Sequence, residues 1–76
     1  MFNELDTVVL SHDIKELGLR LGDVGAVVHV YENRTAYEVE FVTGEGKTIA
    51  VTTLTNLDIR PMLRQEILHV RTFATA

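Results

Sequence analysis

One stretch of this chain restricts its fold more than any other. From residue 36 to residue 43, the apolar side chains Tyr37, Val39 and Phe41 alternate with two glutamates. Successive side chains of an extended strand point to opposite faces, so the apolar side chains share one face and the acids share the other. The pattern predicts a strand over 36–43 with one face in a core and the other in water.

Turn residues divide the rest of the chain into further short apolar segments. Gly44–Lys47 supplies glycines for a tight hairpin, and Glu32–Thr35 is a polar loop of hairpin length. The segment after the glycine turn alternates again, which is expected to place Ile49 and Val51 in the core. The strands predicted in this way are 5–10, 26–31, 36–43, 48–53 and 59–60.

Short strands spaced by about 10–12 residues are typical of small sandwiches and barrels. Five strands in so short a chain favour the barrel, because closure removes the exposed edges of a small sheet. Residues 14–21, punctuated by Gly18, are expected to form a folded-over loop and not a helix. The predicted fold class is mostly β: a single domain over 1–76, with a five-stranded SH3-like barrel at about 4–61 and a C-terminal extension at 62–76.

The extension allows two interpretations. Leu63, Ile67 and Val70 fit one face of a helix that begins near Pro61. Residues 67–70 fit equally well an extra strand on the barrel edge, and the poor helix formers in this segment favour the strand. The sequence therefore predicts either an extra strand or a short helix after the barrel.

The composition excludes several classes of function. The chain has no cysteine, which removes disulfides, thiolate metal sites and thiol catalysis together. Seven basic against eleven acidic residues give a net charge of −4, which opposes the electrostatic attraction behind nucleic-acid binding. No apolar run is long enough to cross a membrane, and the acidic N-terminus does not resemble a secretory signal. We expect a cytoplasmic protein.

Five runs of the sequence carry a resemblance to a known family. They are 5–10, 21–31, 36–41, 58–61 and 66–71. In their order and spacing, the chain resembles the bacterial family called domain of unknown function 4926 over nearly its whole length. The resemblance implies a small bacterial domain. Because that family has no established activity, it supplies no functional residues.

The start of the second strand carries another, shorter resemblance. Gly22-Asp23, Gly25 and Val27 resemble the strand start of KOW-type and other SH3-like barrels, in which the glycine lets the backbone turn under a neighbouring strand and the valine fills the barrel. Ribosomal, transcription and enzyme-accessory proteins share this motif, so it implies a fold and no single function. This chain is acidic where nucleic-acid-binding relatives are basic, and it has no tryptophan for the aromatic groove of peptide-binding SH3 domains.

Two groups of residues resemble catalytic sets. Ser11, His12 and Asp13 are the residue types of a hydrolase triad, but adjacent side chains of an extended chain point to opposite faces. We expect a polar strand end in which Ser11 or Asp13 caps a turn. Glu38 and Glu40 share a strand face at a spacing found in glycosidases, yet a solvated strand offers no cavity to shift their pKa values. We interpret them as a charged outer face.

Metal and phosphate sites are not expected either. His12, His29 and His69 lack the spacing of zinc ligands and the acidic pattern of calcium sites, which leaves a histidine cluster assembled by the fold as the alternative. Gly44–Lys47 lacks the longer glycine pattern and the following helix of a phosphate loop. We therefore predict no catalytic residue, no metal and no cofactor, and a protein that is not an enzyme.

Recognition surfaces remain as the predicted functional elements. Tyr31, at a strand end, is of a type that anchors interfaces, with a half-buried ring that closes the barrel as the alternative. Ile67, Leu68, Val70 and Phe73 are apolar residues in a segment that the barrel does not need, so they either pack back on it or are covered by another chain.

These residues predict a small binding or accessory module that contacts another protein or its own copy, as in a homodimer. The alternative is a KOW-like nucleic-acid-binding domain, in which scattered basic residues converge only in space. No membrane partner is expected.

Overall fold

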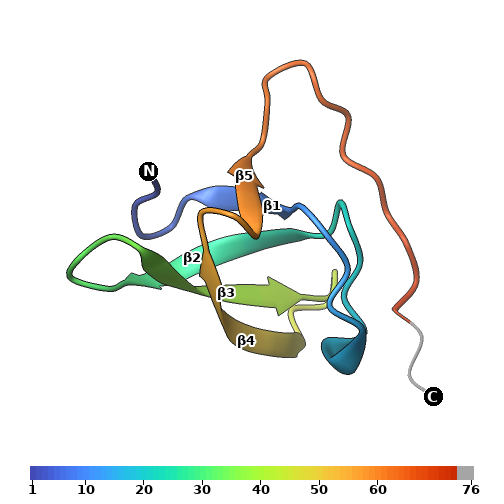
Figure 1. Cartoon of the computed structure of the whole chain (residues 1–76). Coiled ribbons are helices and arrows are strands. Elements are labelled where there is room, and N and C mark those ends of the chain that lie inside the picture. Colours follow the sequence, from blue (N-terminus) through green and yellow to red (C-terminus); the bar gives the residue numbers. More distant parts are fainter. Residues whose placement is uncertain (74–76) are drawn as a thin grey trace.

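The structure is a computed structural model and describes residues 1–73 of the chain. Five strands form one antiparallel sheet, in the order β4-β3-β2-β1-β5 (Figure 1). The strands are β1 (Thr7–Leu10), β2 (Val24–Val30), β3 (Ala36–Val42), β4 (Thr48–Thr55) and β5 (Ile59–Pro61). The folded-over loop before β2 contains a short 3-10 turn, η1 (Lys15–Leu17). The prediction of a mostly β fold is confirmed.

β3 lies inside the sheet and places its predicted apolar face in the core. Tyr37 and Val39 are fully buried, and Phe41 is nearly so. β3 pairs with β2 along one side and with β4 along the other. The other buried apolar residues that pack with these three are Phe2, Val8, Leu10, Leu19, Val27, Leu54 and Ile59.

The register of β4 differs from the prediction. Val51, expected in the core, is 51% exposed because it pairs with Glu40 on the outer face of β3. A bulge after Phe41 leaves Ile49 without a direct partner, so Ala50 faces Phe41 and both Ile49 and Ala50 pack partly against the core. A shift of one residue exchanges the two faces of a strand, and this bulge could not be read from the alternation alone.

A glycine allows the beginning of β2 to lie close against β3. A Cβ on Gly25 would lie 2.8 Å from Val39 Cγ1 and 2.9 Å from the Glu40 carbonyl oxygen. No other residue type fits there without movement of the backbone. Two residues later, Val27 is fully buried in the core.

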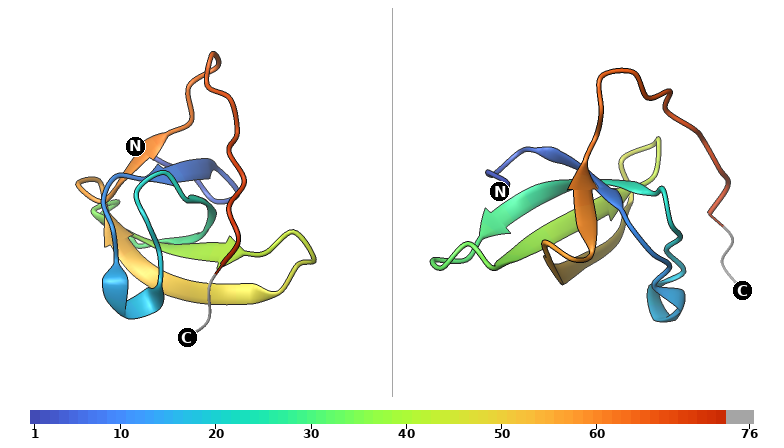
Figure 2. Two further views of the ribbon diagram at one scale, coloured as in Figure 1. Left: turned by 90° about the vertical axis from the view of Figure 1, so that its right-hand side faces the viewer. Right: turned by 45° about the horizontal axis from the view of Figure 1, so that its top comes forward.

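The sheet curls strongly, as Figure 2 shows, but no backbone hydrogen bonds between β4 and β5 close it among the described residues. The expectation that closure removes the edges is therefore wrong. A turn that ends with a bond from the Asp58 N–H to the Thr55 carbonyl redirects the chain from β4 to β5, so the two strands do not run side by side. They meet through the core instead, where Leu54 and Ile59 are both buried.

The extension forms neither of the predicted elements. Residues 62–73, here called the C-terminal arm, contain no strand and no helix, and residues 74–76 of the predicted extension lie outside the described residues. Pro61 has no N–H for a further ladder bond, and the β-branched residues that follow do not favour a helix. Within residues 1–73, no helix has the length and apolar character needed to span a membrane.

Candidate interaction surface

The C-terminal arm leaves the sheet after β5, loops outward and returns past the end of the sheet towards the loop that carries η1 (Figures 1 and 2). It forms no backbone hydrogen bond with any strand among the described residues. Two ion pairs and one aromatic ring attach it to the rest of the chain. The arm is thus held by side chains at a few points.

The first ion pair attaches the beginning of the arm to β5. Arg60 donates to Glu66 in a bidentate pair, Nη1 to Oε1 at 2.7 Å and Nη2 to Oε2 at 2.6 Å. The backbone N–H of Leu63 also donates to Glu66 Oε1, at 2.7 Å. Hydrogen bonds from Arg60 and then from Leu63 lower the pKa of Glu66 to about 2. The arm therefore begins with a compact turn whose carboxylate is already bound.

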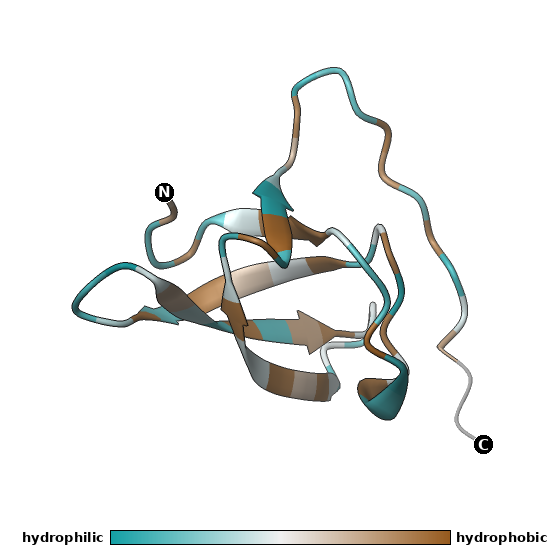
Figure 3. Cartoon of the chain, viewed as in Figure 1, coloured by the Kyte–Doolittle hydropathy of each residue, from teal (hydrophilic) through white to brown (hydrophobic). Residues whose placement is uncertain are grey.

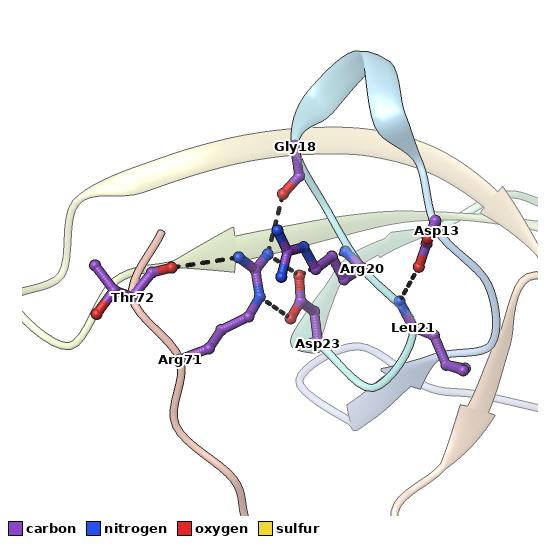
Figure 4. Close-up of polar contacts among 7 residues, drawn as sticks. All are labelled: Asp13, Gly18, Arg20, Leu21, Asp23, Arg71 and Thr72. Carbon is purple, nitrogen blue, oxygen red and sulfur yellow. Dashed lines mark hydrogen bonds and ion pairs between the residues drawn. The ribbon is translucent and has the colours of Figure 1, made fainter. Parts of the chain in front are cut away.

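The second ion pair joins the end of the arm to the turn before β2 (Figure 4). Arg71 donates to Asp23 from Nε to Oδ1 at 2.8 Å and from Nη2 to Oδ2 at 2.6 Å. Arg71 Nη2 also donates to the Gly18 carbonyl at 3.0 Å. The Asp23 side chain is only 16% exposed, whereas that of Glu66 is 32% exposed. The second pair is the more shielded from solvent.

Local backbone bonds hold Asp23 in place independently of the arm. The Arg20 N–H donates to Asp23 Oδ2 at 2.8 Å, and the Leu21 N–H donates to Asp13 Oδ1 at 2.8 Å (Figure 4). Burial acts to raise the pKa of Asp23, but the hydrogen bonds from Arg71 and from the Arg20 N–H outweigh it, so the net shift is downward. The turn therefore presents a charged carboxylate that is ready for a cation.

Phe73 provides the third attachment point. Its ring lies against Gly18, where an added Cβ would be 3.0 Å from Phe73 Cζ. Gly18 also has a φ of +72°, in the left-handed region that favours glycine. The Arg71 guanidinium lies 5.8 Å from the centroid of the Phe73 ring, within the range of a cation–π contact. Phe73 is half-buried and packs back on the loop.

Between its two ion pairs, the arm exposes apolar side chains. Ile67 is 83% exposed, Leu68 is 63% exposed and Val70 is 97% exposed. Figure 3 shows hydrophobic stretches separated by hydrophilic ones along the arm. Apolar side chains of this size are the components of an interface when they are gathered on one segment.

Two hollows lie beneath the arm. The larger, of about 310 Å³, is bounded by Phe41 of the sheet and by Val70 and Phe73 of the arm. The smaller, of about 220 Å³, is bounded by Val9 of the sheet and by Ile67 of the arm. The arm therefore runs past the end of the sheet without packing closely on it.

The predicted interface residues fall in two separate places. Ile67, Leu68, Val70 and Phe73 all lie on the arm, three of them exposed and one half-buried. Tyr31 begins the β2–β3 loop, which lies at the opposite end of the sheet from the end of the arm (Figure 1). The structure thus brings four of the five residues into one segment and leaves Tyr31 outside it.

Tyr31 is 40% exposed on the outer face of the sheet. Its hydroxyl donates to Glu38 Oε2 at 2.9 Å, and its ring meets the His29 ring edge to face at a centroid distance of 4.8 Å. Hydrogen bonding to Glu38, with some burial, raises the pKa of Tyr31. The ring does not complete the core.

The residues of the apparent triad bind other groups. His12 Nε2 lies 2.7 Å from Asp58 Oδ1, and Nδ1 lies 2.9 Å from the Asp13 carbonyl oxygen. The hydrogen bond with Asp58 is the main cause that raises the pKa of His12. The Asp13 carboxylate caps the Leu21 N–H, as expected for a polar strand end. This histidine ties the end of β1 to the β4–β5 turn.

The outer-face acids are bound by threonines of the next strand. Thr53 donates to Glu38 Oε2, and Thr48 donates to Glu40 Oε2 at 2.8 Å. Within the described part of the chain, no group of three or more His, Asp or Glu side chains is placed to hold a metal ion.

The attachment points of the arm were not anticipated from the sequence. Arg71 and Asp23 are 48 positions apart, and Arg60 and Glu66 are six apart, a separation at which side chains meet in neither a regular strand nor a regular helix. The glycine turn that contains Asp23 was the one available signal, and it indicated a turn without indicating what the carboxylate binds.

Comparisons with known proteins place a boundary at the start of the arm. The family model described as Domain of unknown function (DUF4926) matches residues 4–61, which include all five strands and exclude the arm. No curated protein and no solved structure matches the chain.

Proposed function

The chain belongs to the DUF4926 family through residues 4–61, and from this premise we propose that it is a small binding module whose C-terminal arm contacts another protein. The sheet serves as the base that carries the arm. The main support is the exposure of Ile67, Leu68 and Val70 on a segment that two ion pairs already hold in place.

Attachment of the arm lowers the entropic cost of binding a partner through its exposed apolar side chains. A partner that docks on a free segment must offset the entropy of ordering it. Here the ion pairs on either side of 67–70 restrict the backbone before a partner arrives, and the hollows beneath the arm leave room for adjustment. Burial of three large apolar side chains contributes about 1.5–3 kcal/mol each when it is complete.

The arrangement of the strands supports an SH3-like barrel as the base. β2, β3 and β4 form consecutive antiparallel hairpins, and β1 pairs with both β2 and β5. Gly25 lies where β2 approaches β3 closely, and Val27 is buried in the core, as the resemblance to KOW-type barrels implies. In this proposal, the arm is an addition to a small barrel and not a part of it.

The placement of basic side chains favours a protein partner over a nucleic acid. Arg60 and Arg71 are bound to carboxylates, and Arg34 donates to Asn3 Oδ1 at 3.1 Å. The net charge of −4 and the pairing of Arg60 and Arg71 with carboxylates both weaken the attraction of phosphates.

The proposal is tested with the double variant Ile67→Lys/Val70→Lys and a matched control, Leu5→Lys/Leu57→Lys. The control adds the same charge at apolar residues that are 84% and 88% exposed elsewhere on the surface. Partners captured from the native host by each variant are quantified by mass spectrometry, with titration of RNA and DNA at low salt in parallel.

We expect the arm variant to lose at least about tenfold in capture of a protein that the wild type and the control retain. Equal capture by all three proteins contradicts the proposal. Tight binding of nucleic acid at low salt, without a protein partner, supports the KOW-like alternative instead.

A further inference from the structure

The two edges of the sheet differ in a way that indicates a second interaction surface, separate from the arm. We propose that β4 is a pairing edge for a second copy of this chain, with two β4 strands joined antiparallel across a two-fold axis into one continuous sheet. This inference concerns self-association through the sheet, whereas the proposed function concerns the arm and a different protein.

β4 has the properties of an open edge. It is the longest strand, with eight residues, and its sequence from Thr48 to Thr55 contains no charged residue, no proline and no glycine. It consists of threonine, valine, isoleucine, leucine and alanine, most of which favour extended structure. Proteins normally protect such an edge with a charge, a proline or a short strand. β4 has none of these three protections, and its one bulge, at Ile49, lies near its beginning and leaves residues 50–55 as a regular edge.

β5, at the opposite edge, is protected in each of these ways. It has only three residues, Ile59–Pro61, and contains both an arginine and a proline. Arg60 is also held by Glu66 of the arm. Additional strands are therefore expected at β4 and not at β5.

The free side of β4 remains available for pairing. Among the described elements, β4 runs along β3 alone, and a turn engages only its last residue: the Asp58 N–H donates to the Thr55 carbonyl, and the Thr55 N–H donates to Asp58 Oδ2 at 2.8 Å. In an antiparallel ladder, alternate residues of an edge strand direct their N–H and C=O groups away from the sheet. Figure 2 shows β4 at one margin of the curled sheet.

The chemistry of β4 fits a second copy of itself. In a two-fold antiparallel arrangement, a charged strand would bring like charges together, but β4 carries none. Threonine and valine cross-strand pairs stabilise such ladders. The nearest acids, Glu38 and Glu40, lie one strand back from the edge, on β3; the hydrogen bonds from Thr53 and Thr48 fix their positions and leave their charge. Val51 stands exposed between these two threonines.

The same geometry limits assembly to two copies. A two-fold interface uses the same edge of both molecules, so pairing consumes both β4 edges. The only remaining edges would be the two protected β5 strands. A short ladder buries little area, so we expect a weak dimer with a dissociation constant on the order of 100 µM.

The test is sedimentation equilibrium of the full chain over concentrations up to about 1 mM. The test variant is Val51→Lys, and the matched control is Val28→Lys, at a valine that is 41% exposed on β2, two strands away from the edge. We expect the wild type and the control to dimerise equally and Val51→Lys to dimerise at least about tenfold more weakly, because it brings two like charges together. Thr53→Lys serves as a second edge variant if Val51→Lys is poorly folded by circular dichroism.

Amide hydrogen exchange of the wild type at low and high concentration locates the contact. Increased protection in β4 at high concentration supports the proposal. The proposal is overturned by a monomer at every concentration, by a dimer that neither edge variant weakens, or by a dimer whose increased protection lies in the arm. A dimer lost in Ile67→Lys/Val70→Lys but kept in Val51→Lys also overturns it while leaving the proposed role of the arm intact.

Discussion

The sheet and the C-terminal arm are held together by different kinds of interaction. The sheet is stabilised by a cluster of buried apolar side chains, five of them fully buried, and by ladders of backbone hydrogen bonds. The arm has no regular structure and depends on two Arg–carboxylate pairs and the Phe73 ring. Burial of apolar side chains contributes strongly to the stability of a fold. Exposed ion pairs contribute little, and their contribution changes with pH and salt. The fold therefore depends on the sheet, and the arm is the part to which we assign the proposed binding.

Substitution of Gly25 by alanine tests the sheet side of this comparison and has the largest expected effect. The new Cβ would lie within 3 Å of Val39 Cγ1, the Glu40 carbonyl oxygen and the Phe41 ring, and a backbone atom cannot move aside without opening β2 from β3. We expect a loss of about 3 kcal/mol in the free energy of unfolding, measured with urea.

The matched control is Gly44→Ala, where an added Cβ meets nothing within 4 Å. Its free energy of unfolding should change by no more than about 0.5 kcal/mol. Equal stability of the two variants would contradict the close approach of Gly25 in β2 to β3.

Replacement of Arg71 by glutamine tests the arm side, with an intermediate effect. The variant removes the ion pair with Asp23 but leaves the bond from the Arg20 N–H that holds the turn. We expect a loss of about 1 kcal/mol or less in global stability. Backbone relaxation by NMR should show faster motion of residues 67–73, with strand amides unchanged. Reduced protection of the amides of β1 and β2 from hydrogen exchange in this variant would mean that the arm supports the fold.

Titration with acid is a second test of the difference between the sheet and the arm. Because the folded-state pKa of Glu66 is lowered from 4.5 to about 2, its ion pair is fully present above pH 4.5 and is lost as the pH falls through 2. The side-chain carboxyl of Glu66, followed by NMR, should titrate with a midpoint near 2. In Arg60→Gln the midpoint should rise towards 4.5, whereas an unchanged midpoint would show that Arg60 does not hold the arm.

The smallest expected effect on stability is that of Ile67→Lys/Val70→Lys. Both side chains are more than four-fifths exposed in the free protein, so the free energy of unfolding should change by no more than about 0.5 kcal/mol. The same variant is expected to lose partner capture. A large loss of stability, measured with urea, would place these side chains in the fold and not in an interface.

The regular parts of the sheet could be predicted from local sequence, and its irregularities could not. The alternation of Tyr37, Val39 and Phe41 is confirmed because both neighbours of β3 bury the same face. Val51 was assigned to the wrong face because a bulge beside Phe41 shifts the register, and a bulge leaves no trace in the apolar pattern. The open edges of the sheet could not be predicted either, because they depend on how the short turn between β4 and β5 redirects the chain.

The candidate site was predictable only in part. Four apolar residues of the arm could be identified as surplus to the sheet, but their attachment could not, because ion pairs across 48 positions depend on the folded geometry. Arg71 and Asp23 are ordinary charged residues in the sequence, and only the return of the arm past the η1 loop brings them together. The contact between the Phe73 ring and Gly18 also forms only because the arm returns to the η1 loop, so it could not be predicted from the sequence.

The separation of fold from arm is tested most directly by amide hydrogen exchange on a chain that ends at Pro61. We expect the amides of β1 to β5 to keep the protection that they have in the full chain, because the arm shares no backbone hydrogen bond with these strands in the described structure. General loss of that protection would contradict it, because the arm would then be required for the fold.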